Sequence, residues 1–138
     1  MKVNQYKKKF QTKFSITTLI RQILMEDEAI KNIVGDKIYP IIAPEKTDGA
    51  FLVYVRDSYS FVRSKQGIWQ QICKVYISCC SNDYDESVAL ADAVFQALEH
   101  NHYHIDEDKD YMRYINMYDS TENVVDDTYI QTLAFEIY

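Results

Sequence analysis

Three alternating histidines, His100, His102 and His104, are the residues whose types and spacing could bind a metal ion. In an extended chain their imidazoles would point to the same side, and Asp106 and Asp108 follow in phase. Imidazole nitrogens and a carboxylate can together bind zinc or nickel. The segment nevertheless leaves a predicted helix and enters a polar connection, where regular alternation is not assured and histidine also complements the helix dipole. We expect a solvated loop and no cofactor, with these histidines as the candidates for a metal-responsive site.

Two acidic segments hold carboxylates that could attract a cation. Asp106, Glu107, Asp108 and Asp110 form the first, and Asp119, Glu122, Asp126 and Asp127 form the second. An EF-hand needs ligands at fixed offsets, a central glycine and a terminal glutamate, and neither segment has this pattern. We therefore expect two solvated acidic loops.

Signatures of catalysis are missing from the sequence. It has no GxSxG elbow, no HExxH motif and no glycine-rich phosphate loop, and its three glycines are Gly35, Gly49 and Gly67. Cys73, Cys79 and Cys80 are odd in number and contain no CxxC pair, which favours reduced, buried thiols over a disulfide or zinc framework. We do not expect an enzyme, although a site assembled from scattered residues would be invisible at this level.

Length and composition indicate one globular domain. The chain has 138 residues, of which 47% are hydrophobic and 26% charged. A net charge of −6 argues against a general nucleic-acid surface, because such a surface needs a basic stripe. Only Lys7, Lys8 and Lys9 are locally basic, within an expected flexible N-terminal arm over residues 1–14. No apolar run suits a membrane span or a signal peptide, so we expect neither membrane insertion nor secretion by that route.

The first half of the domain, expected to span 15–138, begins with helical periodicity. Ile16, Leu19, Ile20, Ile23 and Leu24 share one stripe of a helix starting at Ser15. A second apolar set continues to Gly35, so the region predicts one bent helix or two short ones. Residues 37–42 predict a short strand that Pro40 confines to a sheet edge or a bulge.

A strand is expected from Ala50, with Leu52 and Tyr54 on one face and Phe51, Val53 and Val55 on the other. The next ten residues, SYSFVRSKQG, predict a polar hairpin connection interrupted by apolar side chains. Such side chains on a loop tip favour contact with a partner, with folding back onto the same domain as the alternative.

The stretch from Gly67 to His100 predicts the central unit of the domain. A strand over residues 68–79 would send Trp69, Cys73, Val75, Ile77 and Cys79 to the core. After capping oxygens at residues 81–83, a helix over residues 83–99 would bury a stripe against the sheet. That stripe consists of Tyr84, Val88, Ala91, Phe95 and Leu98.

Two further strands complete the predicted fold. They cover residues 111–118 and 128–138, and the last one turns Tyr129, Leu133, Phe135 and Ile137 to one face. The fold class is therefore α+β. We expect a four- to five-stranded, mostly antiparallel sheet with an N-terminal helix and one long helix packed on one face.

The order of these elements, with their residues, resembles a known family. A helix leads into VGDKIYP, a strand FLVYV follows, a long strand runs into SCCSNDYDESVALADAVFQAL, and TYIQTLAFEIY ends the chain. The chain resembles the tail-completion (head–tail joining) proteins of long-tailed bacteriophages and prophages, including relatives of tail terminators. Ser81, Tyr84, Glu86 and residues 89–93 are similar to that family's polar turn and alanine-rich helix. The histidine and acidic connection and the doubled cysteine depart from its pattern.

The resemblance implies a structural virion-assembly protein without an active site. Its subunits would form a ring, commonly hexameric, contacting other head or tail proteins in the virion or the host cytoplasm. The 12 tyrosines and the apolar hairpin fit protein contacts. The candidate interface comprises Tyr59, Phe61, Val62 and Arg63, with Lys7, Lys8, Lys9 and Phe10 on the arm. The alternative is a small α+β binding or regulatory module, metal-responsive through His100, His102 and His104.

Overall fold

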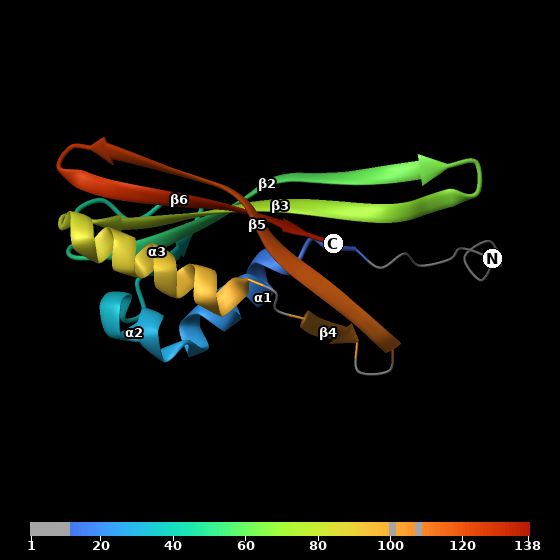
Figure 1. The fold of residues 1–138 in the computed structure, drawn as a ribbon, viewed down its shortest axis with the longest axis horizontal. Helices are drawn as coiled ribbons and strands as arrows, with labels where there is room; N and C mark the ends of the chain where they lie inside the picture. Colours follow the sequence, from blue (N-terminus) through green and yellow to red (C-terminus); the bar gives the residue numbers. More distant parts are fainter. Residues whose placement is uncertain (1–11, 100–101, 107–108) are drawn as a thin grey trace, which may run out of the picture.

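The computed structural model describes residues 12–99, 102–106 and 109–138, with the side chains of 69 and 102–113 left undescribed. In this part of the chain, three helices lie on one face of a six-stranded sheet (Figure 1). The elements are α1 (Ile16–Glu26), α2 (Glu28–Val34), β1 (Ile38–Pro40), β2 (Phe51–Ser64), β3 (Gly67–Ser81), α3 (Tyr84–Leu98), β4 (His102–Asp106), β5 (Lys109–Val125) and β6 (Thr128–Ile137). The predicted α+β class is confirmed.

The sheet has the order β1-β2-β3-β6-β5-β4, which is more strands than the four or five expected. β1 pairs with β2 in parallel, and the other described pairs are antiparallel, so the sheet is mixed. The undercount arose at His102–Asp106, whose polar residues predicted a connection but which form β4 against β5. Pro40 lies in the edge strand β1, as predicted, because proline cannot donate to a second neighbour.

The N-terminal helical region consists of two short helices. Asp27 separates them with an extended backbone, and its carboxylate accepts a 3.0 Å hydrogen bond from the Ile30 N–H, capping α2. Gly35 ends α2 with a φ of 65°, in the left-handed region that glycine adopts without strain. Ile16, Ile20 and Leu24 are buried, which confirms the predicted stripe of α1.

The hairpin between β2 and β3 is much longer than the sequence indicated. β2 extends to Ser64 and β3 begins at Gly67, so the turn is Lys65 and Gln66 instead of a ten-residue connection. Phe61 and Val62 therefore lie on a strand and not on a loop tip. The prediction was wrong because alternating serines read as loop, whereas the intervening Tyr, Phe and Val favour strands.

Helix α3 packs on the sheet with a face that partly matches the one expected, since Leu98 is buried and Ala91 and Phe95 pack against the core as predicted. Asp83 caps it, accepting a 3.1 Å hydrogen bond from the Glu86 N–H, which confirms the predicted start. Tyr84 and Val88, however, are each 43% exposed. The buried residues are Ser87, Leu90, Val94, Ala97 and Leu98. The sequence pattern missed the part of this face that includes Ser87, a polar residue that can be buried because its hydroxyl donates to the Tyr84 carbonyl (2.6 Å).

Strand β5 occupies much of the predicted acidic loop. It continues to Val125, so the connection to β6 is the two-residue turn of Asp126 and Asp127, which have φ values of 48° and 64°. The predicted loop over residues 119–127 was therefore wrong, apart from this turn. On β6, Leu133, Phe135 and Ile137 are buried as expected.

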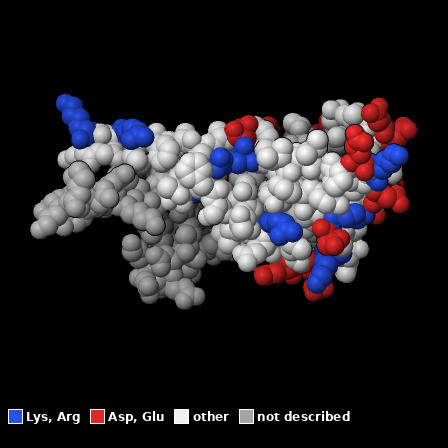
Figure 2. All heavy atoms as spheres, turned by 180° about the vertical axis from the view of Figure 1, so that it is seen from behind, with Lys and Arg blue, Asp and Glu red and all other residues white. Residues whose placement is uncertain are grey.

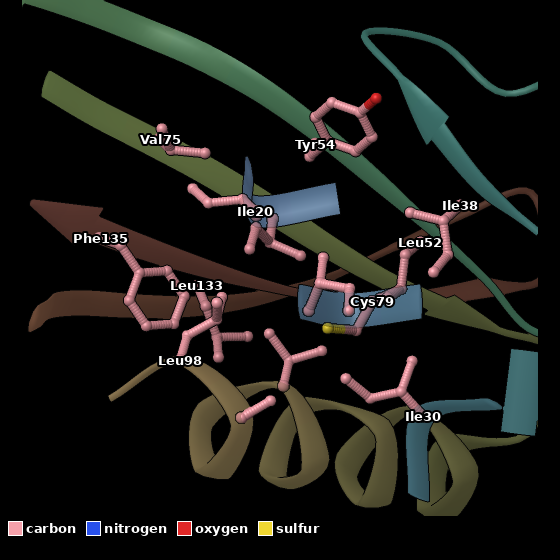
Figure 3. Packing of buried hydrophobic residues seen from close by; sticks show 14 of the residues in the cluster. Ile20, Ile30, Ile38, Leu52, Tyr54, Val75, Cys79, Leu98, Leu133 and Phe135 are labelled. Carbon is pink, nitrogen blue, oxygen red and sulfur yellow. The ribbon is translucent and has the colours of Figure 1, made fainter. Parts of the chain in front are cut away.

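The core lies between the helices and one face of the sheet. Cys73, Val75, Ile77 and Cys79 of β3 are fully buried, and Leu52 of β2 and Phe135 of β6 lie beside them (Figure 3). This confirms the predicted core face of the long strand. The opposite face of the sheet carries no helix in the described part of the chain (Figure 1). None of the described helices combines the length and apolar character that crossing a membrane requires.

Candidate protein–protein interface

The predicted metal candidates lie almost wholly outside the described residues. This holds for His100 and for the side chains of His102 and His104. Among the residues that are described, no group of three or more His, Cys, Asp or Glu side chains could hold a metal ion.

Glu122, one of the predicted acidic-loop residues, has a structural role instead. Its carboxylate accepts hydrogen bonds from the Tyr84 hydroxyl (2.9 Å) and from Nε2 of Gln131 (3.1 Å). These two donors lower the pKa of Glu122 below its ordinary value. The contacts tie the first turn of α3 to strands β5 and β6, so this carboxylate positions elements of the fold.

The three thiols are free and buried, as expected. Burial, reinforced by the neighbouring Cys80, raises the pKa of Cys79 well above its ordinary value. Burial likewise raises the pKa of Cys80 to about 11. Thiols held in the protonated form are poor nucleophiles and poor metal ligands, which fits small core residues.

The most prominent surface feature is a hairpin that projects from the sheet (Figure 1). β6 pairs with β3 only from Cys73 onward, and β1 pairs with β2 only up to Tyr54. Residues 58–72, here called the projecting hairpin, therefore form a two-stranded ribbon in the described structure. Such ribbons are marginally stable alone in water and leave backbone groups unpaired at their edges.

Two predicted interface residues lie exposed toward the tip of this hairpin. Phe61 is 37% exposed, and the Arg63 guanidinium stacks over its ring at 5.3 Å from the centroid. Val62 is half-buried on the opposite face of the ribbon, and Arg63 and Lys65 are exposed. The described hairpin thus presents apolar side chains beside positive charge.

Tyr59 faces its own domain instead. Its hydroxyl accepts a hydrogen bond from the Lys13 N–H and donates one to the Gln71 side chain. Its ring contacts Phe14 edge-on at 5.1 Å between centroids. This contact is the folding back that the sequence left open as an alternative. The remaining interface candidates, Lys7, Lys8, Lys9 and Phe10, lie outside the described residues.

A second surface, which the sequence analysis did not identify, lies at the other end of the sheet. It is an open groove of about 580 Å³ on the helix-free face, here called the apolar groove. Its apolar lining includes Ile41, Ile42, Phe51, Val53, Val125 and Ile130. Ile41 and Ile42 are 73% and 77% exposed. The strand predicted over residues 37–42 was too long, because β1 ends at Pro40 and leaves Ile41 and Ile42 outside the sheet. The available signal for the groove was this apolar pair between Pro40 and Pro44.

Charge is unevenly distributed between these two surfaces. The face in Figure 2 carries basic side chains at the hairpin end and most of its acidic side chains at the opposite end, where further basic side chains lie among them. Residues 58–72 contain Arg63 and Lys65 and no Asp or Glu. At the other end, Asp126 lines the apolar groove and Asp127 is exposed beside it, although Lys46 also contributes to the lining.

Comparison with known proteins gives a fold relationship. The structure is similar to a chain from the virion of a native gene transfer agent particle, with a TM-score of 0.72 and 18% identity. The match covers 86% of this chain and 89% of that one. No family model and no curated protein sequence matches the chain. The comparison therefore establishes a shared α+β fold over nearly the full length of both chains.

Proposed function

We propose that this chain is a structural subunit of a phage-type virion, acting in tail completion or head–tail joining as an oligomeric ring. The observation that carries the proposal is the shared fold with a chain of a gene transfer agent virion over 86% of the sequence. The order and residues of VGDKIYP, FLVYV and the strand–turn–helix unit, which resemble tail-completion proteins, support the finer assignment.

The described surface is consistent with a role in protein contacts. It combines a projecting hairpin that lacks a third strand with an apolar groove that side chains leave open. Apolar patches of this kind commonly mark binding sites. We propose that Phe61, Val62 and Arg63 of the hairpin, with Tyr59 at its base and Lys7–Phe10 of the preceding segment, contribute to the ring interface.

The role in particle assembly is tested by removing the protein from the element that encodes it. If the chain completes the tail or joins it to the head, its loss leaves filled heads and separate tails, visible by negative-stain electron microscopy. Supplying the gene in trans should restore joined particles. Normal yields of infectious or transducing particles without the protein would contradict the proposal.

The interface is tested in the same complementation system. Phe61→Ser with Val62→Ser should reduce both ring formation and particle yield, because each change removes apolar contact area from the hairpin. A matched control is Val124→Ser, which removes an apolar side chain that is 54% exposed and does not line the groove. An unchanged oligomer by light scattering would remove Phe61 and Val62 from the interface.

A further inference from the structure

We infer that the projecting hairpin of one copy docks into the apolar groove of the next copy, so that the subunits associate head to tail. This inference rests on the proposed function, since it names the partner of the hairpin within the assembly. It commits to a second copy of this chain as the occupant of the groove. Exposed apolar side chains on both surfaces, backbone strain, position and charge each support it.

The backbone at the groove is strained in a way that displays an apolar side chain. Ile41 has a φ of 66°, a left-handed conformation that is a genuine outlier for a β-branched residue. Its N–H donates a 2.8 Å hydrogen bond to the Tyr54 carbonyl, which holds the conformation in place. The side chain nevertheless remains 73% exposed. Strain retained without intramolecular burial is typical of a binding surface.

The hairpin cannot reach the groove of its own chain. Strand β2 starts at the groove with Phe51 and ends at the hairpin turn with Ser64. Its 14 residues span about 40 Å at the usual rise of a strand. The two surfaces therefore lie at opposite ends of the sheet (Figure 1), and only another copy can bring them together. A contact between two different surfaces is heterologous, and repeated contacts of this type generate rings or open chains.

The charges around the two surfaces are complementary. Exposed Arg63 and Lys65 flank Phe61 and Val62 on a hairpin that lacks acidic residues. Asp126 lines the groove, as does Lys46, and Asp127 is exposed beside it. Docking the hairpin would place the two basic side chains beside this acidic turn. The attraction would favour the head-to-tail orientation over contacts between two hairpin tips, whose basic side chains repel each other.

A mixing experiment with two disabled variants tests this arrangement directly. The hairpin variant carries Phe61→Ser and Val62→Ser, and the groove variant carries Ile41→Asn and Ile42→Asn. In sedimentation velocity, each variant alone should self-associate at least about tenfold more weakly than the wild type. An equimolar mixture should form a dimer and stop there, because it retains one intact hairpin and one intact groove per pair. Val124→Ser should assemble like the wild type.

The single substitution Ile41→Asn separates a binding role from a merely structural one. Asparagine tolerates positive φ, so the urea midpoint of the isolated chain should rise while its association weakens. Three results would overturn the inference. The first is unaltered association of the Ile41→Asn variant. The others are a mixture that stays monomeric while the wild type assembles, and a wild type that is monomeric at every concentration. The particle phenotype is a separate readout. A chain that joins heads to tails without forming the mixed dimer would keep the proposed function and lose this inference.

Discussion

The backbone N–H of Lys13 donates a 2.8 Å hydrogen bond to the hydroxyl of Tyr59, which lies 46 residues further along the chain. The same hydroxyl donates a 2.6 Å hydrogen bond to Oε1 of Gln71 on β3. One phenol thus connects the segment that enters α1 with both strands at the base of the projecting hairpin. It anchors the base of the projecting hairpin to the segment that leads into α1.

Tyr59→Phe should destabilise the chain by about 1–2 kcal/mol, because two partly buried hydrogen bonds are lost while the packing of the ring against Phe14 is kept. Urea unfolding measures the loss, and hydrogen exchange should show faster exchange of the hairpin amides. Tyr138→Phe is the control, since it removes an exposed hydrogen bond to Glu136 and should change stability little. Equal effects of the two substitutions would show that the Lys13–Tyr59 contact does not anchor the hairpin.

The buried face of α3 is tested by two neighbouring residues. Leu90→Ala should lower the free energy of unfolding by about 2–5 kcal/mol, because Leu90 is fully buried and its loss leaves a cavity. Val88→Ala should change it by less than about 0.5 kcal/mol, because Val88 is 43% exposed. Thermal or urea denaturation of both variants checks the prediction. The reverse order would favour the stripe that the sequence pattern first indicated.

Much of the fold could be predicted because local chemistry and the fold agree. The alternation along β3, the cap at Asp83, the helix end at Gly35 and the edge position of Pro40 each follow from one residue type in one backbone conformation. The face of α3 could be predicted only in part, because it includes a buried Ser87 whose hydroxyl donates to the Tyr84 carbonyl. The second half of β2 and the end of β5 were also not predicted as strands, because both are largely exposed and polar.

The candidate interface was only half predictable. Phe61 and Val62 could be singled out because apolar residues interrupt a polar segment. The groove depends on residues from β2, β3, β5 and β6 and from the segments that follow β1 and β5, and no local pattern relates Ile41 to Ile130. Only the sheet register, which pairs Ile130 with Cys80 and Cys80 with Phe51, brings this surface together.

The three thiols should react very slowly with thiol reagents in the native protein below pH 9. Burial raises the pKa of Cys80 from 9.0 to about 11, so its thiolate fraction at pH 8 falls about a hundredfold. The native state keeps a proton that the unfolded state loses in this range. Stability from these thiols is therefore fully present below pH 9 and declines as the pH rises toward 11. Labelling with a disulfide reagent at pH 8 should be at least about a hundredfold slower without urea than with it. Rapid labelling of a thiol in the folded chain would contradict this.

The turn between β5 and β6 should be improvable, because both of its residues have positive φ. Asp126 and Asp127 have φ values of 48° and 64°, as a two-residue type I′ turn requires, and Asn-Gly is the pair that best tolerates them. Asp126→Asn with Asp127→Gly should raise the free energy of unfolding by up to about 1 kcal/mol, whereas Asp127→Val should lower it by about 1–2 kcal/mol. Asp92→Asn on the exposed side of α3 controls for the removal of negative charge. Urea denaturation of the four proteins would distinguish the contributions. If Asp92→Asn stabilised the chain as much as the double variant, the gain would come from the removal of negative charge. If Asp127→Val left the free energy of unfolding unchanged, the turn would not be held at positive φ.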